Sequence, residues 1–172
     1  MSATSRPVRV GDPVPDVTLP LHDGRTAKLR ELAAGQVVVL YFYPKDGTPL
    51  CTAQACAFRD AYEVFARLGA LVIGVSSDSV ERHQKFAQSQ RLPFLLASDA
   101  DGALRRALGV PRTWGIFPGR VTYVIDRQGI VRHIFEAQWT ARQHVEEALR
   151  VVQKLVEEES DQTPAAGSDR PA

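Results

Sequence analysis

The chain has 172 residues, of which 44% are hydrophobic and 24% charged, a balance typical of one soluble globular domain with a sizeable core. The formal net charge of +1 gives no electrostatic reason to expect nucleic acid or an anionic membrane surface as a partner. No apolar run approaches the roughly 18 residues of a membrane span, and residues 1–16 lack the apolar stretch of a secretory signal. We therefore expect a cytoplasmic protein, in which a structural disulfide would be unusual.

The first half of the chain alternates between strand and helix patterns. Residues 16–32 suggest a small hairpin that turns at Asp23–Gly24. The continuous apolar run VVVLYFYP at 37–44 predicts a strand that is buried on both faces. Apolar residues at spacings of three and four over 55–65 then indicate a helix, and residues 70–77 indicate a second buried strand.

The second half continues the alternation and ends in a hairpin and a helix. Residues 79–92 predict a helix with Ser79 as its N-cap. A short strand at 94–99 and a short helix at 101–110 follow. We expect a hairpin over 120–137 that turns at Asp126–Gly129, and then an amphipathic helix over 141–158.

This order of elements predicts an α/β protein with a thioredoxin-like fold, in which a mixed central sheet carries helices on both faces. The loops that follow the parallel strands meet at one edge of the sheet, where ligands tend to bind, and residues 44–51 form one of these loops. Residues 1–156 make up the predicted domain. Residues 157–172, with no apolar side chain larger than alanine and five acidic residues, are predicted to be a disordered polar tail.

Both cysteines of the chain, Cys51 and Cys56, lie in the stretch YFYPKDGTPLCTAQACAFRD at 41–60. Cys51 follows Gly47, Thr48 and Pro49 at a strand-to-helix turn. The first turn of a helix presents unpaired N–H groups and a partial positive charge, so a thiol placed there loses its proton more easily and becomes a nucleophile. The rigid turn and the hydroxyl of Thr48 suit a pocket for a small, polar and reactive molecule.

Three other interpretations of the cysteine pair are possible. A zinc site needs three or four protein ligands, and none of the four histidines, His22, His83, His133 and His144, lies near the pair in sequence; we expect no metal. The C-x-x-C redox motif is absent, because four residues separate the cysteines. Two inert buried cysteines are the third interpretation, and it suits Cys56 better than Cys51.

The spacing of the two cysteines suggests a switch. In a continuous helix the Cα atoms of residues 51 and 56 would be about 8.7 Å apart, with side chains about 140° apart around the axis. A disulfide requires Cα atoms within roughly 7 Å and Cβ vectors that face each other. The two cysteines can therefore form a disulfide only if the helix unwinds locally. A reactive thiol with a second cysteine nearby is the arrangement needed to form a sulfenic acid and capture it as a disulfide.

The stretch 41–60 resembles the active-site segment of the peroxiredoxins, in particular the peroxiredoxin Q group, also called bacterioferritin comigratory proteins. Pro44, Thr48 and Cys51 match the pattern P-x-x-x-T-x-x-C, and Cys56 matches the second cysteine five residues later. The resemblance covers roughly residues 10–155. Leu50 stands where these proteins often have glycine, which affects the flexibility of the turn but no catalytic side chain.

The resemblance implies a thiol peroxidase without a metal, haem or flavin cofactor, whose substrates are hydrogen peroxide and organic hydroperoxides. Cys51 would be the peroxidatic cysteine, and Cys56 the resolving cysteine that forms an intramolecular disulfide, which thioredoxin or a similar dithiol protein then reduces. Thr48 would bind the sulfur and the peroxide, Pro44 would shield the sulfur from water, and Arg120 would hold the thiolate and the polarised peroxide. Members of the group are often monomers, and we expect a monomer here.

The role of Arg120 is also reasonable on physical grounds, because attack by sulfur pushes negative charge onto the leaving oxygen and a fixed guanidinium stabilises such charge. Two competing functions use the same cysteines. A thiol–disulfide oxidoreductase acting on proteins would be expected to carry C-x-x-C, which is missing. A redox sensor or holdase could use the unwinding helix to expose apolar surface, and peroxide turnover with thioredoxin would separate it from a peroxidase.

Overall fold

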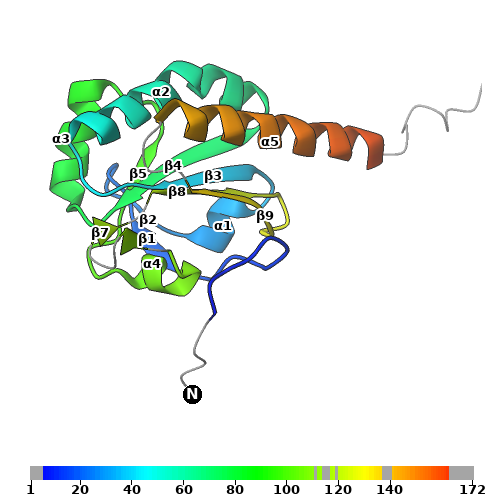
Figure 1. Ribbon diagram of the computed structural model, residues 1–172, viewed down its shortest axis with the longest axis horizontal. Helices are drawn as coiled ribbons and strands as arrows, with labels where there is room; N and C mark the ends of the chain where they lie inside the picture. The colour runs from blue at the N-terminus through cyan, green and yellow to red at the C-terminus, as the bar shows by residue number, and fades with distance from the viewer. Residues whose placement is uncertain (1–5, 111, 114–116, 119, 137–140, 163–172) are drawn as a thin grey trace, which may run out of the picture.

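A five-stranded mixed sheet forms the centre of the protein, as its computed structural model shows (Figure 1). The structure describes residues 6–110, 112–113, 117–118, 120–136 and 141–162. The strands are β1 (Thr18–Pro20), β2 (Thr26–Lys28), β3 (Val37–Phe42), β4 (Ala70–Ser76), β5 (Leu95–Ser98), β6 (Arg112–Thr113), β7 (Phe117–Pro118), β8 (Val121–Ile125) and β9 (Val131–Glu136). The helices are α1 (Leu29–Ala33), α2 (Pro49–Arg67), α3 (Val80–Gln90), α4 (Ala103–Leu108) and α5 (Ala141–Gln162).

The central sheet has the strand order β5-β4-β3-β8-β9. Strands β3, β4 and β5 are parallel, whereas β8 runs antiparallel to β3 and β9 antiparallel to β8. All six residues of β3 are buried, as its unbroken apolar sequence predicts for a central strand that is covered on both faces. The loop that leaves this central strand leads directly into α2.

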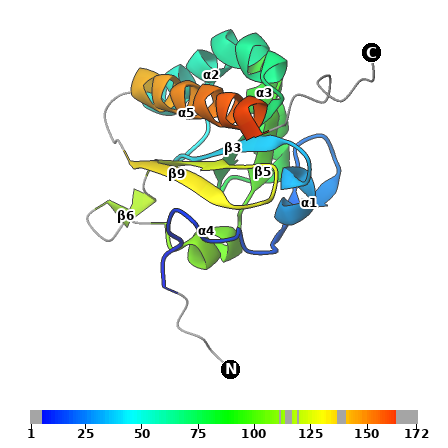
Figure 2. The same ribbon diagram turned by 90° about the vertical axis from the view of Figure 1, so that its right-hand side faces the viewer.

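Helices cover both faces of the sheet, which confirms the predicted α/β architecture. Figures 1 and 2 show α2, α3 and α5 on one side of the sheet and α1 and α4 on the other. The alternation of side chains along β3 serves both layers: Val39 and Tyr41 pack with α2 and α5, while Leu40 and Phe42 pack with α1 and α4. Among the described residues, no helix combines the length and the apolar character that crossing a membrane would need.

Most predicted elements are present, and the differences concern short segments. Ser79 accepts a hydrogen bond from the N–H of Arg82 at 3.2 Å, as an N-cap should. Helix α1 and the two-residue strands β6 and β7 were not predicted. Helix α1 has five residues, too few for a helical period to be visible, and it is held by the burial of Leu29 and Ala33.

The expected boundary between domain and tail at residue 157 is wrong, because α5 continues through Gln162. Two acidic residues of the supposed tail find basic partners on the sheet side. Glu158 pairs with Arg132 of β9 at 2.8 Å, and Glu159 pairs with Arg127 of the β8–β9 turn at 3.2 Å. These contacts hold the last helical turns against the domain; residues 163–172 lie outside the described residues.

Candidate active site

The N-terminus of α2 is built by a sequence that turns and then starts a helix. Gly47 has a φ of +81°, a conformation that glycine adopts without strain. Thr48 follows as the extended N-cap residue, and Pro49 occupies the first helical position, where its missing N–H is not needed. Cys51 is the third residue of the helix and so lies in its first turn, near the positive end of the helix dipole.

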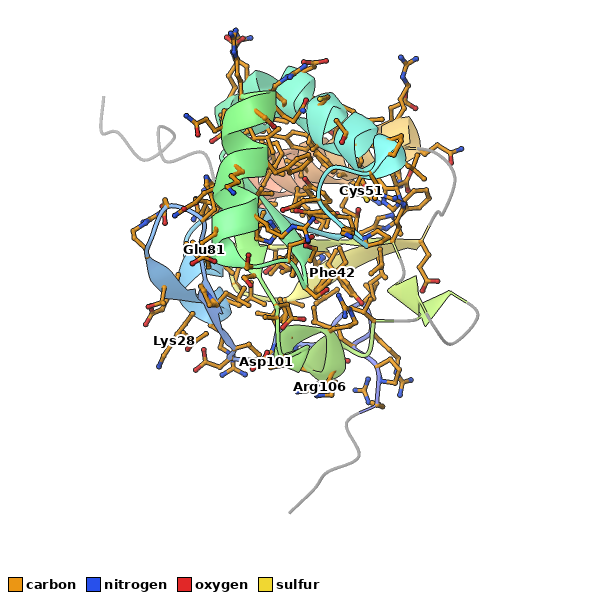
Figure 3. All side chains as sticks on the ribbon, turned by 90° about the vertical axis from the view of Figure 1, so that its left-hand side faces the viewer. Lys28, Phe42, Cys51, Glu81, Asp101 and Arg106 are labelled. Carbon is orange, nitrogen blue, oxygen red and sulfur yellow. The ribbon has the colours of Figure 1, made fainter. Side chains whose placement is uncertain are left out.

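The sulfur of Cys51 is buried against the guanidinium of Arg120. The thiol side chain is 1% exposed and Arg120 is 5% exposed, and Nη2 of Arg120 lies 3.1 Å from Sγ. The strand register explains why two residues so far apart in sequence meet. Val121 of β8 pairs with Phe42 at the end of β3, so Arg120 lies beside the loop that leads to Cys51. Figure 3 shows Cys51 near the point where this loop enters α2.

Gln54 is the third residue of this contact between Cys51 and Arg120, and sequence reasoning did not assign it a role. It lies one helical turn after Cys51, on the same face of α2, and is fully buried. Its Oε1 accepts a hydrogen bond from Nη1 of Arg120 at 2.8 Å. Two nitrogens of the guanidinium are therefore held by hydrogen bonds, one to the sulfur of Cys51 and one to the amide oxygen of Gln54. The feature of the sequence that could have identified Gln54 is its spacing of three residues from Cys51.

Two of the three other predicted site residues belong to the same loop. Pro44 and Thr48 are half-buried. The hydroxyl of Thr48 donates a hydrogen bond to the carbonyl oxygen of Lys45 at 3.1 Å. The structure thus brings Cys51 and Arg120 into contact and places Thr48 three residues away in the turn. The predicted bond from Thr48 to sulfur or peroxide stays a prediction.

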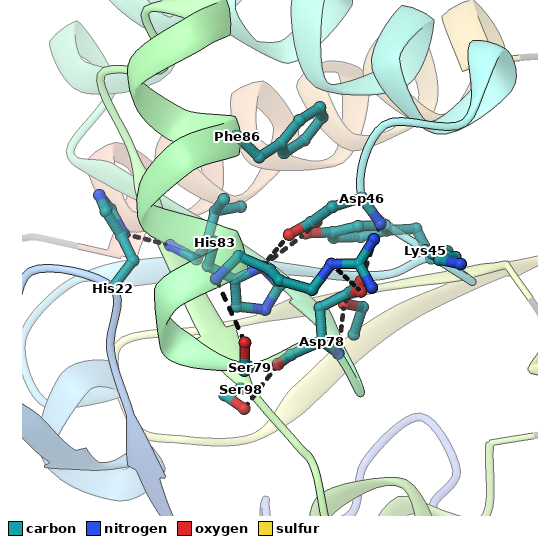
Figure 4. Close-up of polar contacts among 12 residues, drawn as sticks. His22, Lys45, Asp46, Asp78, Ser79, His83, Phe86 and Ser98 are labelled. Carbon is teal, nitrogen blue, oxygen red and sulfur yellow. Dashed lines mark hydrogen bonds and ion pairs between the residues drawn. The ribbon is translucent and has the colours of Figure 1, made fainter.

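A network of buried hydrogen bonds fixes the loop between β3 and α2 through Asp46 (Figure 4). Asp46 accepts a hydrogen bond from the hydroxyl of Tyr43 at 2.5 Å and lies 2.6 Å from Nδ1 of His83, a fully buried residue of α3. The other ring nitrogen of His83 lies 3.0 Å from the carbonyl oxygen of Ala97 and must carry a hydrogen, because a carbonyl only accepts. The N–H of Asp46 donates to Asp78 at 2.8 Å. The loop is thereby tied to α3 and to two strands.

Within the described parts of the chain, Asp46, Asp78 and His83 form a group close enough to bind a metal ion, with ligand atoms within 4.8 Å of one another. Their hydrogen bonds fit a structural role instead. Asp46 and His83 bond to each other, and Asp78 accepts hydrogen bonds from the Asp46 N–H and the Ser76 hydroxyl. We therefore interpret the group as an anchor for the loop.

Cys56 has different surroundings. It is half-buried on α2, and its thiol donates a hydrogen bond to Oε1 of Gln90, the last residue of α3, at 3.4 Å. Arg59 donates to the backbone oxygen of Gln90 at 2.8 Å. Both cysteines are free thiols and α2 is continuous between them, so the reduced protein has the arrangement that the spacing predicted.

An aromatic layer lies under α2. Tyr41 stacks on Phe58 of α2, with ring centroids 4.5 Å apart, and Gly74 leaves room for the Tyr41 hydroxyl, which a Cβ at that position would approach to 2.7 Å. Burial raises the pKa of Tyr41 well above its ordinary value, and the nearby Asp46 carboxyl acts in the same direction. This phenol therefore stays neutral and packs against Phe58 in the third turn of the helix.

Most of the chain matches known sequences. The profile of the AhpC/TSA family matches residues 10–134. The chain is 46% identical over 149 residues to a wheat (Triticum aestivum) protein named peroxiredoxin Q, chloroplastic, a match that covers 86% of this chain and 68% of the wheat protein. The corresponding protein of Populus jackii is also 46% identical over 149 residues, covering 86% of this chain and 70% of its own length.

Solved structures show the same fold. The peroxidoxin BcpB of Mycobacterium tuberculosis is 34% identical and superposes with a TM-score of 0.79 over 86% of this chain and 98% of that one. The bacterioferritin comigratory protein of Xanthomonas campestris, described in connection with alkyl peroxide reduction, is 30% identical with a TM-score of 0.75 and covers 84% of this chain and 99% of its own.

Proposed function

Because the chain belongs to the AhpC/TSA family, within its peroxiredoxin Q group, and is a thiol-dependent peroxidase, we propose a catalytic cycle that runs through Cys51 and Cys56. The observation that carries the proposal is the 3.1 Å contact between the Arg120 guanidinium and the sulfur of Cys51 at the first turn of α2. A helix N-terminus and a fixed cation lie at the same sulfur, and both are complementary to the negative charge of the attacking nucleophile.

In the first step, the thiolate of Cys51 attacks the terminal oxygen of a hydroperoxide. The O–O bond breaks, Cys51 becomes a sulfenic acid, and the remaining oxygen leaves as an alkoxide or hydroxide that takes up a proton. Negative charge moves from sulfur to the leaving oxygen, and Arg120 stabilises it because the guanidinium remains charged and its two nitrogens are held by sulfur and by Gln54. Thr48, from the rim of the loop, orients the peroxide, and Pro44 limits the access of water.

In the second step, the thiol of Cys56 attacks the sulfenic sulfur of Cys51. The S–O bond breaks, the S–S bond forms, and the hydroxyl leaves with the proton of Cys56 as water. The half-buried position of Cys56 supports this role, because its sulfur can reach the surface when α2 opens. Thioredoxin or a similar dithiol protein then reduces the disulfide through a mixed disulfide, and the cycle starts again.

We propose hydrogen peroxide and organic hydroperoxides as substrates, with no bound cofactor and with a monomer as the working form. Organic substrates are supported by similarity to the Xanthomonas campestris protein, whose description names alkyl peroxide reduction. Cytoplasmic location also remains our proposal; the plant relatives are named as chloroplastic proteins, and that name applies to them.

The test is a peroxide titration of three reduced proteins, followed by mass spectrometry of both cysteines. The wild type should consume peroxide and form one internal disulfide. Cys51→Ser should lose turnover. Cys56→Ser should consume one equivalent of peroxide to form a sulfenic acid at Cys51, which excess peroxide then over-oxidises. Full thioredoxin-dependent turnover by Cys56→Ser would remove Cys56 from the cycle, and turnover by Cys51→Ser would overturn the proposal.

A further inference from the structure

We propose that Gln90 is a positioning residue that latches Cys56 into α2 and thereby controls how fast the disulfide can form. Gln90 is the one described residue that receives hydrogen bonds from two side chains of α2 through two different atoms. Its side-chain oxygen accepts from Cys56 at 3.4 Å, and its backbone oxygen accepts from Arg59 at 2.8 Å. The inference rests on the proposed function, since it concerns the step in which Cys56 acts.

The α3 side of this latch is fixed. Phe86 and Ala87 of α3 are buried in the core that α2 shares, and His83 is bonded to Asp46 and to the sheet. Helix α3 ends at Gln90, and its last carbonyl groups are capped by the N–H of Arg91, which has a left-handed conformation with a φ of +53°. A hydrogen bond to Gln90 therefore ties α2 to an element that stays in place.

The α2 side must move for catalysis to finish. A continuous helix holds residues 51 and 56 too far apart for a disulfide, so residues around Cys56 must leave the helix before its sulfur reaches the sulfenic acid of Cys51. The bond from Cys56 to Gln90 is present in the closed helix and is lost when the helix opens. It therefore lowers the population of the open state and slows the second step.

The rate of this step decides the fate of the sulfenic acid. In the open state it reacts with Cys56 to give the disulfide and water. In the closed state its sulfur can instead attack the terminal oxygen of a second hydroperoxide. The O–O bond breaks, the sulfenic acid is oxidised to sulfinic acid, and the hydroperoxide is reduced to an alcohol or water. A latch on Cys56 therefore sets the peroxide concentration at which the protein inactivates itself.

The experiment compares four proteins in a single-turnover reaction with increasing hydrogen peroxide, quenched and analysed by mass for disulfide and sulfinic acid. Gln90→Met removes the acceptor but keeps the length of the side chain. Gln90→Glu keeps an acceptor oxygen at the same place. Gln88→Met is the matched control, because Gln88 is an exposed glutamine on the same helix. The rate of the first peroxide step is measured for each protein as a readout of Cys51.

For Gln90→Met we expect disulfide formation to be faster by about two- to tenfold, the usual effect of losing one hydrogen bond. The peroxide concentration that gives half sulfinic acid should rise by the same factor, while the first peroxide step is unchanged. Gln88→Met should behave like the wild type. Gln90→Glu should form the disulfide at the wild-type rate or more slowly. A Gln90→Met protein that partitions as the wild type does, or a Gln90→Glu protein that behaves as Gln90→Met does, overturns the latch.

A change confined to general stability would look different. If Gln90→Met only loosened the fold, the first peroxide step and the partition between disulfide and sulfinic acid would both change. Failure of the proposed cycle is also distinguishable, because the wild type would then form no Cys51–Cys56 disulfide at any peroxide concentration.

Discussion

The two cysteines lie on one helix, yet they differ in burial and in the charge of the group that bonds to the sulfur. Cys51 is buried, and a charged donor from Arg120, the residue before β8, fixes its sulfur. Cys56 is half-buried, and its thiol makes a neutral hydrogen bond to the end of a neighbouring helix. Hydrogen bonds that involve a charge are roughly twice as strong as neutral ones. One sulfur is thus held in position, and the other is held so that it can be released.

The difference teaches where rigidity and mobility are needed in a two-step redox reaction. The first step requires the donors to be aimed before the peroxide arrives, because oriented charge lowers the barrier only if it need not reorganise. The second step requires the helix to open, and a few weak contacts at one turn open at a free energy far below that of global unfolding. The fold provides the first by sheet register and the second by contact between two helices.

Replacing Arg120 by lysine should give the largest effect. Lysine keeps the positive charge but cannot contact sulfur and the Gln54 amide with two fixed nitrogens, so we expect the rate of peroxide attack to fall by about 10²–10³. Stopped-flow measurement of sulfenic acid formation is the test, and Arg67→Lys at an exposed site is the control. A rate within about twofold of the wild type would remove Arg120 from the reaction.

Replacing Gln54 by methionine should give an intermediate effect on the same step. Methionine fills the buried space but no longer accepts the hydrogen bond from Arg120 at 2.8 Å. Loss of one bond to a charged group should slow peroxide attack by about tenfold while the disulfide step keeps its rate. If Gln54→Met changed the disulfide step instead, the separation between the two cysteine environments would be wrong.

Acidic pH should give the smallest effect, a loss of folding stability through His22 beside strand β5. His22 accepts the N–H of Leu96 in β5 at 3.0 Å, and burial lowers its pKa below the ordinary 6.5. The unfolded chain therefore takes up a proton at higher pH than the folded protein does, so this contribution to stability is complete above pH 6.5 and is lost as the pH falls.

We test this with thermal unfolding between about pH 7.5 and pH 5.5. His22→Asn supplies an acceptor oxygen in place of Nδ1 and has no titrating group, so its midpoint should fall less than that of the wild type over this range. The control is Gln88→Asn, on the exposed face of α3. His144→Asn would not serve, because His144 is buried. Parallel curves for the wild type and His22→Asn would contradict the role of His22.

Sequence patterns predicted the parts of the molecule that depend on local chemistry. The apolar run of β3, the N-cap Ser79 and the turn before Cys51 are each readable within a few residues, and the structure confirms all three. Arg120 was placed in the site by resemblance, and its contact with Cys51 depends on the pairing of β8 with β3. The contact itself could not be derived from the sequence near either residue.

The remaining features were hidden because they depend on tertiary contacts. Asp46 and His83 are 37 positions apart, and Cys56 and Gln90 are 34 positions apart. No period or motif connects such pairs before the helices are packed. The end of α5 was misjudged for the same reason, since an acidic run suggests a solvated tail unless Arg132 and Arg127 lie opposite it.

The central claim is that α2 is closed in the reduced protein and opens around Cys56 when the disulfide forms. Amide hydrogen exchange over residues 50–62, compared between the reduced and the oxidised protein, tests it most directly. We predict strong protection in the reduced state and its loss in the oxidised state, with unchanged protection in β3 and β8. Equal protection of residues 50–62 in both states, with the Cys51–Cys56 disulfide confirmed by mass, would contradict the account.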